Sequence, residues 1–308
     1  MTVNSRQPAT DNRLPLVHFA LFSVAFFFSL NYLISKLGMR EFAPLSFAWL
    51  RVVGAAVILG IVERFDPEPP LSREDRRLVA GFAILGVVLN QTLFLTGLSF
   101  TTIPVAAILI TTIPAFAHLA AILLGRERAS APRIGGIALA GAGALLIVGG
   151  EALHGDRAFA LRSFIGALMI IGNCLSFALY LAFSKPAMAR LSARRVVAWM
   201  FAVGSVLMFP ISAWSLAHQR WSAISPRAWL ALVLVIAGPT VAAYLLNAWA
   251  LRHADASLVA AYTYLQPVMA AFLGAVFLGE HIHAILGVAA AMIFAGVWLA
   301  GRTMEPAM

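Results

Sequence analysis

The sequence predicts an all-α membrane protein with ten transmembrane helices, arranged as two inverted five-helix repeats. Composition is the first reason: 61% of the 308 residues are hydrophobic and 11% are charged, whereas soluble domains average about 25% charged residues. The second reason is that apolar stretches of bilayer-spanning length, about 20 residues, follow one another along the whole chain. The third is that the most apolar region of the second half repeats a region of the first half without a gap.

Hydropathy predicts helices at about 16–37, 44–62, 78–97, 102–124, 133–150, 163–184, 195–217, 228–250, 256–278 and 283–301. The connections between them are too short to hold an aqueous domain. The net charge of +9 is spread over these connections and forms no basic stripe, so we expect no nucleic-acid partner. The single cysteine, Cys174, excludes an internal disulfide and a cysteine-based metal cluster. We expect neither a metal nor a cofactor.

Two long stretches match at a shift of 153 residues. Leu98–Glu127 falls on Leu251–Glu280, so that Pro114 coincides with Pro267 and the terminal glutamates coincide. Spans interrupted by proline at corresponding positions are typical of secondary transporters whose site lies between two repeats. The predicted organisation is a tail at 1–15, repeats at 16–150 and 163–301, a linker at 151–162 and a tail at 302–308.

The first helices of the two halves also match, at a shift of 149 residues. Ser35-Lys36 falls on Ser184-Lys185 in this register. Counting Lys and Arg with the N-terminus inside gives 15 on the inner side and 6 on the outer side. Positive charge collects on the cytoplasmic side, so we expect both termini in the cytoplasm of a bacterial inner membrane. Five helices per repeat then make the second repeat inverted.

Several short motifs resemble those of the EamA-type drug/metabolite transporters. In the second half these are Asp255-Ala-Ser-Leu, Leu265-Gln-Pro-Val and Leu278-Gly-Glu280, and Gly125-Arg-Glu127 is a weaker copy in the first half. Within the family the chain resembles the amino-acid exporter branch called YddG. The resemblance covers nearly the whole chain. It implies ten helices, two inverted repeats and export of small metabolites.

Amide, phenol and guanidinium groups within the spans predict a polar pocket. Tyr262 and Gln266 share one face of the ninth helix with Asp255, and the alternative is that they form interhelical hydrogen bonds with no ligand role. Polar groups are costly in hydrocarbon unless they find partners, which favours one shared pocket. The predicted substrate-binding residues are Asn31, Tyr32, Arg51, Asn90, Gln91, Tyr180, Tyr244, Asn247, Tyr262 and Gln266. The predicted hinges are Pro104, Pro114, Pro239 and Pro267.

The charged residues near the spans allow different interpretations. Arg51 either holds a substrate carboxylate through two hydrogen bonds or extends to the outer headgroups. Extension to the headgroups is the interpretation for Lys36 and Lys185, and a helix cap is the interpretation for Asp255. No carboxylate lies inside a predicted span. We therefore expect a pocket of little net charge, suited to zwitterions or neutral metabolites, without tight proton coupling.

The predicted function is export of small metabolites, amino acids including aromatic ones among them, by alternating access. The alternatives are a channel-like pore and an exporter of other neutral metabolites or drugs. An enzyme is not expected, because no nucleophile or acid pair lies within the bilayer and no zinc or phosphate-loop motif occurs. The fifth and tenth helices are rich in small residues and pack within the monomer or form a dimer face. The expected partners are a small-molecule substrate and the lipid bilayer, with a monomer or weak dimer as the assembly.

Overall fold

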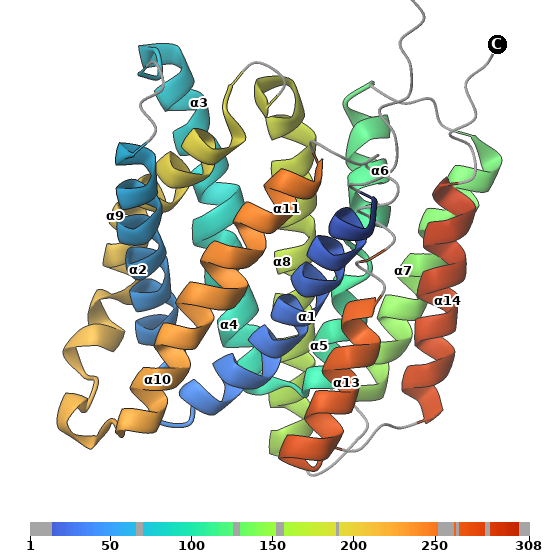
Figure 1. Ribbon diagram of the computed structural model, residues 1–308. Helices are drawn as coiled ribbons and strands as arrows, with labels where there is room; N and C mark the ends of the chain where they lie inside the picture. The colour runs from blue at the N-terminus through green and yellow to red at the C-terminus, as the bar shows by residue number, and fades with distance from the viewer. Residues whose placement is uncertain are drawn as a thin grey trace, which may run out of the picture.

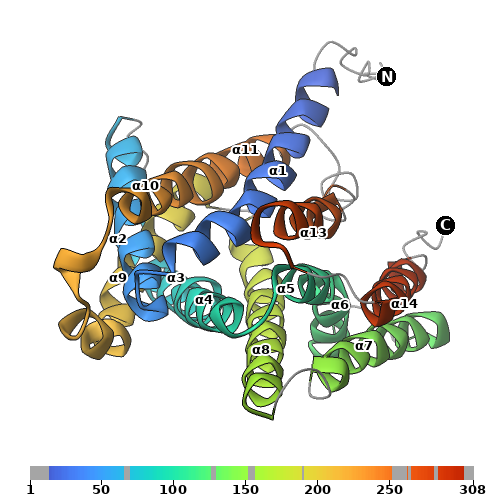
Figure 2. The ribbon, with the colours of Figure 1, turned by 90° about the horizontal axis from the view of Figure 1, so that it is seen from below.

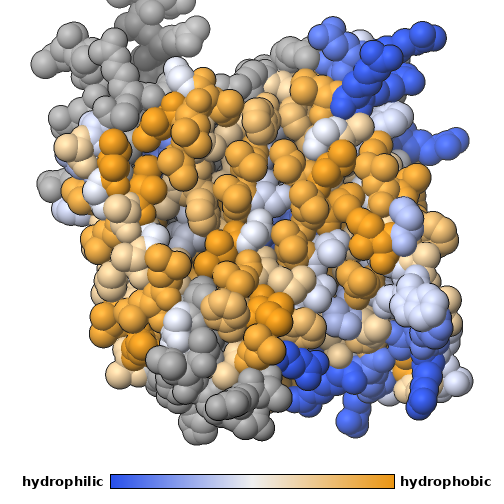
Figure 3. Space-filling view, turned by 180° about the vertical axis from the view of Figure 1, so that it is seen from behind, coloured by the Kyte–Doolittle hydropathy of each residue, from blue (hydrophilic) through white to orange (hydrophobic). Residues whose placement is uncertain are grey.

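The computed structural model describes residues 14–65, 70–125, 130–151, 157–188, 191–251, 262, 265–280 and 284–301, and every regular element in these ranges is a helix (Figure 1). The all-α class is therefore confirmed for the described part. Seven helices in this part are long and apolar enough to cross a membrane, and three shorter apolar helices accompany them. Figure 3 shows a broad apolar band on one face, with hydrophilic side chains gathered at its two ends.

Four of the seven long helices are α1 (Leu14–Gly38), α2 (Pro44–Arg64), α8 (Arg157–Met188) and α9 (Ala193–Ala217). The three shorter apolar helices lie in α7 (Ala131–Glu151), α13 (Leu265–Leu278) and α14 (Ala284–Gly301). Three further spans are built from shorter pieces: α3 (Arg73–Ala83), η1 (Ile84–Leu89) and α4 (Asn90–Phe100); α5 (Ile103–Ile110) and α6 (Ile113–Leu123); α10 (Pro226–Val235), η3 (Ile236–Ala242) and α11 (Ala243–Leu251). A 3₁₀ turn, η2 (Trp221–Ala223), precedes α10.

Two helix starts differ from the hydropathy ranges. The third span begins at Arg73 rather than near residue 78, because the Ser72 hydroxyl accepts a hydrogen bond from the Asp75 amide at 3.0 Å and caps a polar first turn. The α8 helix begins at Arg157, inside the range predicted as a linker. In both cases polar residues extend an apolar helix beyond its hydrophobic part, which hydropathy alone does not detect.

The fourth expected span is interrupted between α5 and α6. The hydroxyls of Thr111 and Thr112 donate to the carbonyls of Ile108 and Leu109, at 2.6 and 2.7 Å. Such local bonds compete with the helical ladder, so α5 ends here. Pro114 then takes a first-turn position in α6, where its missing amide hydrogen costs nothing.

Two long spans contain a π-helical segment, and the two segments occupy matching positions. Adding 153 to the bounds of η1 gives 237–242, and η3 covers Ile236–Ala242. A glycine packs against each segment: a methyl group at Gly54 would lie 2.5 Å from the Ile236 side chain, and one at Gly204 would lie 2.6 Å from Val87. Each widened turn is thus accommodated by a helix that lacks a side chain at the contact.

The small-residue helices α7 and α14 pack against each other (Figure 2). A methyl group at Gly143 would lie 2.9 Å from the Ala289 carbonyl oxygen, and one at Gly296 would lie 2.5 Å from the Gly136 carbonyl oxygen. Residues later in α7 contact residues earlier in α14, so the two helices are antiparallel. At the shift of 153 residues, Gly143 corresponds to Gly296 and Gly136 corresponds to Ala289. The two contacts are therefore equivalent, with the roles of α7 and α14 exchanged.

The loop between α1 and α2 is tied to the start of α10 by the exposed Glu41. Its carboxylate accepts a hydrogen bond from the Ser225 amide at 2.5 Å and one from the Ser225 hydroxyl at 2.8 Å. These two bonds hold the pKa of Glu41 below its ordinary value, the amide bond more strongly than the hydroxyl bond. Ser225 also caps α10 by accepting from the Ala228 amide.

A lowered carboxyl pKa makes this contact sensitive to acid. The stabilisation is present above the ordinary carboxyl pKa and is lost as the pH falls through the lowered pKa of Glu41. Replacing Ser225 with alanine removes the hydroxyl donor, so the pKa of Glu41 is expected to rise toward its ordinary value. Carbon-13 NMR of labelled Glu side chains in both proteins measures this pKa. An unchanged pKa in Ser225→Ala would contradict the contribution of the hydroxyl.

Candidate functional site

The predicted site residues that the structure describes lie inside the helical bundle. Six of them are buried: Asn31, Tyr32, Arg51, Gln91, Tyr180 and Gln266. Asn90, Tyr244 and Tyr262 are half-buried, and the side chain of Asn247 lies outside the described part. These residues come from α1, α2, α4, α8, α11, α13 and the single described residue 262.

One polar group forms where α4 meets α8. The Asn173 amide nitrogen donates to the Asn90 carbonyl at 2.9 Å, and the Gln91 amide nitrogen lies 3.3 Å from the Asn90 side-chain oxygen. The remaining side-chain oxygen of Gln91 is buried without a hydrogen-bond partner among the described residues. Tyr32 packs edge-to-face on Phe94 beside this group, with ring centroids 5.5 Å apart. The group therefore has a free acceptor and an aromatic neighbour.

A second polar group joins α2 to η3. The Arg51 Nε donates to the Thr240 hydroxyl at 2.8 Å, and the Thr240 hydroxyl donates to the Val235 carbonyl at 2.8 Å. The Arg51 Nη1 is buried without a partner among the described residues. Thr240 was not predicted. Its place beside Pro239 within an apolar span is the signal that would have found it.

Aromatic rings pack against Tyr180 and Tyr244, two of the four tyrosines of the candidate site. Tyr244 packs edge-to-face on Phe28 of α1 and Phe201 of α9, with ring centroids 6.2 and 5.7 Å apart. Tyr180 contacts Phe82 of α3 and Phe177 of its own helix, at 6.2 and 5.5 Å. Helices from both halves of the chain therefore contribute ring contacts to these two tyrosines.

Tyr262 and Gln266 both contact α1. The Tyr262 hydroxyl lies 2.7 Å from His18 Nδ1, a residue that the sequence reasoning did not single out. The backbone carbonyl of Gln266 accepts a hydrogen bond from the Ser29 hydroxyl at 3.3 Å. For Tyr262 the structure thus has the interhelical hydrogen bond that was the alternative to a substrate contact.

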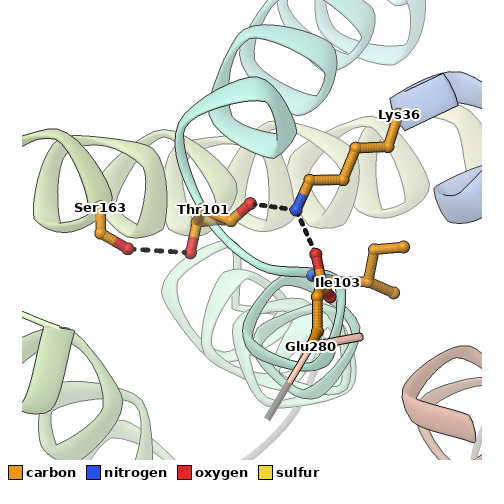
Figure 4. Close-up of polar contacts among 5 residues, drawn as sticks. All are labelled: Lys36, Thr101, Ile103, Ser163 and Glu280. Atoms are coloured by element: carbon orange, nitrogen blue, oxygen red, sulfur yellow. Dashed lines mark hydrogen bonds and ion pairs between the residues drawn. The ribbon is translucent and has the colours of Figure 1, made fainter. Parts of the chain in front are cut away.

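Lys36 does not extend to the headgroups, so that prediction is wrong. Its ammonium forms an ion pair with Glu280 and donates to the Thr101 carbonyl at 2.8 Å (Figure 4). The second carboxylate oxygen of Glu280 accepts from the Ile103 amide at 2.7 Å, and the Ser163 hydroxyl donates to the Thr101 hydroxyl at 3.4 Å. We call Lys36, Thr101, Ile103 and Glu280 the end cluster. It joins α1, the α4–α5 connection and the end of α13.

The predicted hinge prolines occupy helix starts and a π-helical turn. Pro104 and Pro114 lie in the first turns of α5 and α6. Pro267 lies in the first turn of the described part of α13, and Pro239 lies inside η3. A proline inside a helix leaves the carbonyl four residues earlier unpaired, and for Pro267 that carbonyl belongs to Thr263, which lies outside the described residues. Pro104 and Pro114 thus start helices rather than bend them.

In the part of the chain that the structure describes, no group of three or more His, Cys, Asp or Glu side chains is arranged to hold a metal ion. Bundled apolar helices with polar atoms inside and an ion-paired cluster at one end define a multi-pass membrane protein with an internal polar site. The EamA-like transporter family model matches residues 15–149 and 164–302. The chain belongs to this family, which is a family of membrane transporters.

The curated relatives include two proteins that carry transporter names. An uncharacterized transporter of Archaeoglobus fulgidus is 26% identical over 271 residues, which cover 87% of this chain and 91% of that protein. The uncharacterized inner membrane transporter YedA of Escherichia coli K12 is 26% identical over 298 residues, covering 94% and 92%. Protein WALLS ARE THIN 1 of Arabidopsis thaliana is 23% identical over 255 residues, covering 72% and 66%. One crystal structure shares the fold, with a TM-score of 0.61 and 16% identity over 94% of this chain and 98% of that chain.

Proposed function

We propose that this protein exports small metabolites, amino acids including aromatic ones, across a bacterial inner membrane by alternating access. The observation that carries the proposal is a pair of buried polar atoms within apolar spans. Arg51 Nη1 and Gln91 Oε1 have no partner among the described residues, although an unpaired buried polar group costs about 1–3 kcal/mol. A solute with a donor and an acceptor would satisfy both atoms.

We propose ten spans in two inverted five-helix repeats, at residues 16–150 and 163–301. Two features support this arrangement. The glycine contact that α7 makes with α14 corresponds, at the shift of 153 residues, to the glycine contact that α14 makes with α7. The two helices also run antiparallel, as equivalent helices of inverted repeats do. The π-helical segments η1 and η3 also match under this shift.

Alternating access requires one end of the bundle to close while the other opens. The end cluster ties α1 to α13 and to the start of α5, which makes it a closing contact for that end. The predicted hinges are Pro104, Pro114, Pro239 and Pro267. Pro104 and Pro114 lie at helix starts and Pro239 lies in η3, where the backbone is already irregular. The excess of Lys and Arg on the opposite side supports cytoplasmic termini, with the end cluster outside.

The ring contacts of Tyr180 and Tyr244 support aromatic amino acids among the substrates. Tyr180 and Tyr244 are held by rings from α1, α3, α8 and α9, which offer apolar faces to an aromatic side chain. The YddG resemblance points to the same substrates. The names of the Archaeoglobus fulgidus relative and of YedA state transport and, for YedA, the inner membrane.

The test is flux through proteoliposomes that contain the purified protein. We expect saturable uptake of labelled amino acids, including phenylalanine, and a loss of about tenfold or more in Gln91→Leu, because the free acceptor disappears. Ser205→Ala is the control, since this exposed hydroxyl bonds only to its own helix at Ala202. Flux that rises linearly with concentration would support the channel-like pore. Uptake of drugs or neutral metabolites, with no uptake of amino acids, would contradict the proposal that amino acids are the substrates.

A further inference from the structure

Arg51 is a buried cation in the middle of an apolar helix. It lies two turns into α2 and is 3% exposed, with Ala48, Val52 and Ala55 of the same helix buried around it. A side chain that reached the headgroups would keep its guanidinium at the surface. The burial of Arg51 rejects that interpretation and leaves the charge inside the bundle.

Among the residues that the structure describes, Arg51 has a hydroxyl partner but no anionic one. The ion pairs that the described residues form join Glu280 to Lys36 and Glu63 to Arg194 and Arg195, so none of them involves Arg51. A buried ion without a counter-charge costs several kcal/mol. A cation that is kept in a span at this cost is a functional-site candidate by default.

The geometry orients the guanidinium toward a ligand. The Thr240 hydroxyl donates its hydrogen to the Val235 carbonyl, so its oxygen can only accept from Arg51 Nε. This bond fixes one edge of the planar Arg51 guanidinium. The Nη1 nitrogen is left with buried hydrogens and no described partner. One charge and one free nitrogen suit a singly charged planar anion better than a phosphate dianion.

Resting on the proposed function, we propose that Arg51 binds the carboxylate of the transported solute and that Thr240 positions the guanidinium for this contact. The substrates are then carboxylates, amino acids among them, and not neutral metabolites. This revises the expectation of a pocket with little net charge, because the described part of the site carries one positive charge that the substrate balances.

The test compares three solutes with the same ring: phenylalanine, 3-phenylpropionate and phenylalaninamide. Competition against labelled phenylalanine is measured in proteoliposomes. We expect 3-phenylpropionate to compete and the amide, which lacks the carboxylate, to fail. Arg51→Gln is expected to raise the KM for phenylalanine about tenfold or more and to abolish the preference for the acid over the amide. Thr240→Val reduces this preference less, and the exposed Arg40→Gln leaves it unchanged.

A second measurement excludes a purely structural role. Arg51→Met removes the charge and keeps most of the volume, so the Tm of the purified protein without solute is expected to stay or rise. A Tm that falls by several degrees would overturn the proposal. So would equal competition by acid and amide, or an acid preference that persists in Arg51→Gln, and either result leaves the transport function intact. Transport of no solute at all overturns both proposals.

Discussion

Glu280→Gln is expected to release one end of the molecule and to lower transport about tenfold or more. The side chains of Lys36 and Glu280 are 23% and 11% exposed, so their ion pair lies between an exposed pair, worth about 0–1 kcal/mol, and a fully buried one, whose breaking costs about 3–5 kcal/mol. A loss of about 2 kcal/mol lowers the ratio of closed to open states at that end roughly 30-fold. Alternating access fails when one end no longer closes.

Hydrogen exchange at the start of α5 reports this release directly. The Ile103 amide donates to the Glu280 carboxylate, and the amide oxygen of a glutamine accepts more weakly than a carboxylate. Exchange of the segment that contains Ile103 is therefore expected to accelerate in Glu280→Gln. Glu41→Gln is the matched control, because Glu41 contacts Ser225 and not the end cluster. Unchanged exchange and unchanged flux in Glu280→Gln would contradict a closing role for the end cluster.

Gly296→Ala is expected to cause the largest loss of stability among single methyl additions to α14. The added methyl group would lie 2.5 Å from the Ala140 nitrogen and from the Gly136 carbonyl oxygen, which are backbone atoms and cannot rotate away. The two helices must separate, at a cost of about 2–3 kcal/mol. We expect a fall in Tm of roughly 5 °C, measured by scanning fluorimetry in detergent.

The same helix provides the control for this prediction. Gly287 has no atom within 4 Å of the position that a methyl group would take. Gly287→Ala is therefore expected to raise helix stability by about 1 kcal/mol through propensity alone. A Tm that falls equally in both variants would show that the effect belongs to the helix backbone and not to the contact with α7.

The sequence predicted the helices well where long apolar runs determine them. It placed α2 at 44–62, and the structure has Pro44–Arg64, because Pro44 starts the helix and the apolar run continues without interruption. Hydropathy did not predict the break at Thr111 and Thr112, because threonine is neutral on such scales while its hydroxyl competes for backbone carbonyls. The Thr-Thr-Ile-Pro order was the available signal.

The residues of the candidate site could be predicted from their types, but their hydrogen-bond and ion-pair partners could not. Buried amides, phenols and Arg51 were found because polar groups in spans are conspicuous. The partners were missed: Thr240 for Arg51, His18 for Tyr262 and Glu280 for Lys36 join segments between 189 and 244 residues apart. Nothing in local pattern specifies which distant helix lies opposite. The recurrence of lysine and glutamate at matching positions in both halves was the one signal that the Lys36 interpretation did not use.

The exchange symmetry of the α7–α14 contact bears on how such a chain could arise. Each helix presents to the other the same arrangement of glycine opposite a backbone carbonyl, so the joined surface is self-complementary. Under the inverted arrangement that we propose, two copies of an ancestral half-length protein would meet through this surface as a two-fold dimer with opposite orientations in the bilayer. Fusion of the duplicated genes would then have required only a connecting segment, and no new complementary face.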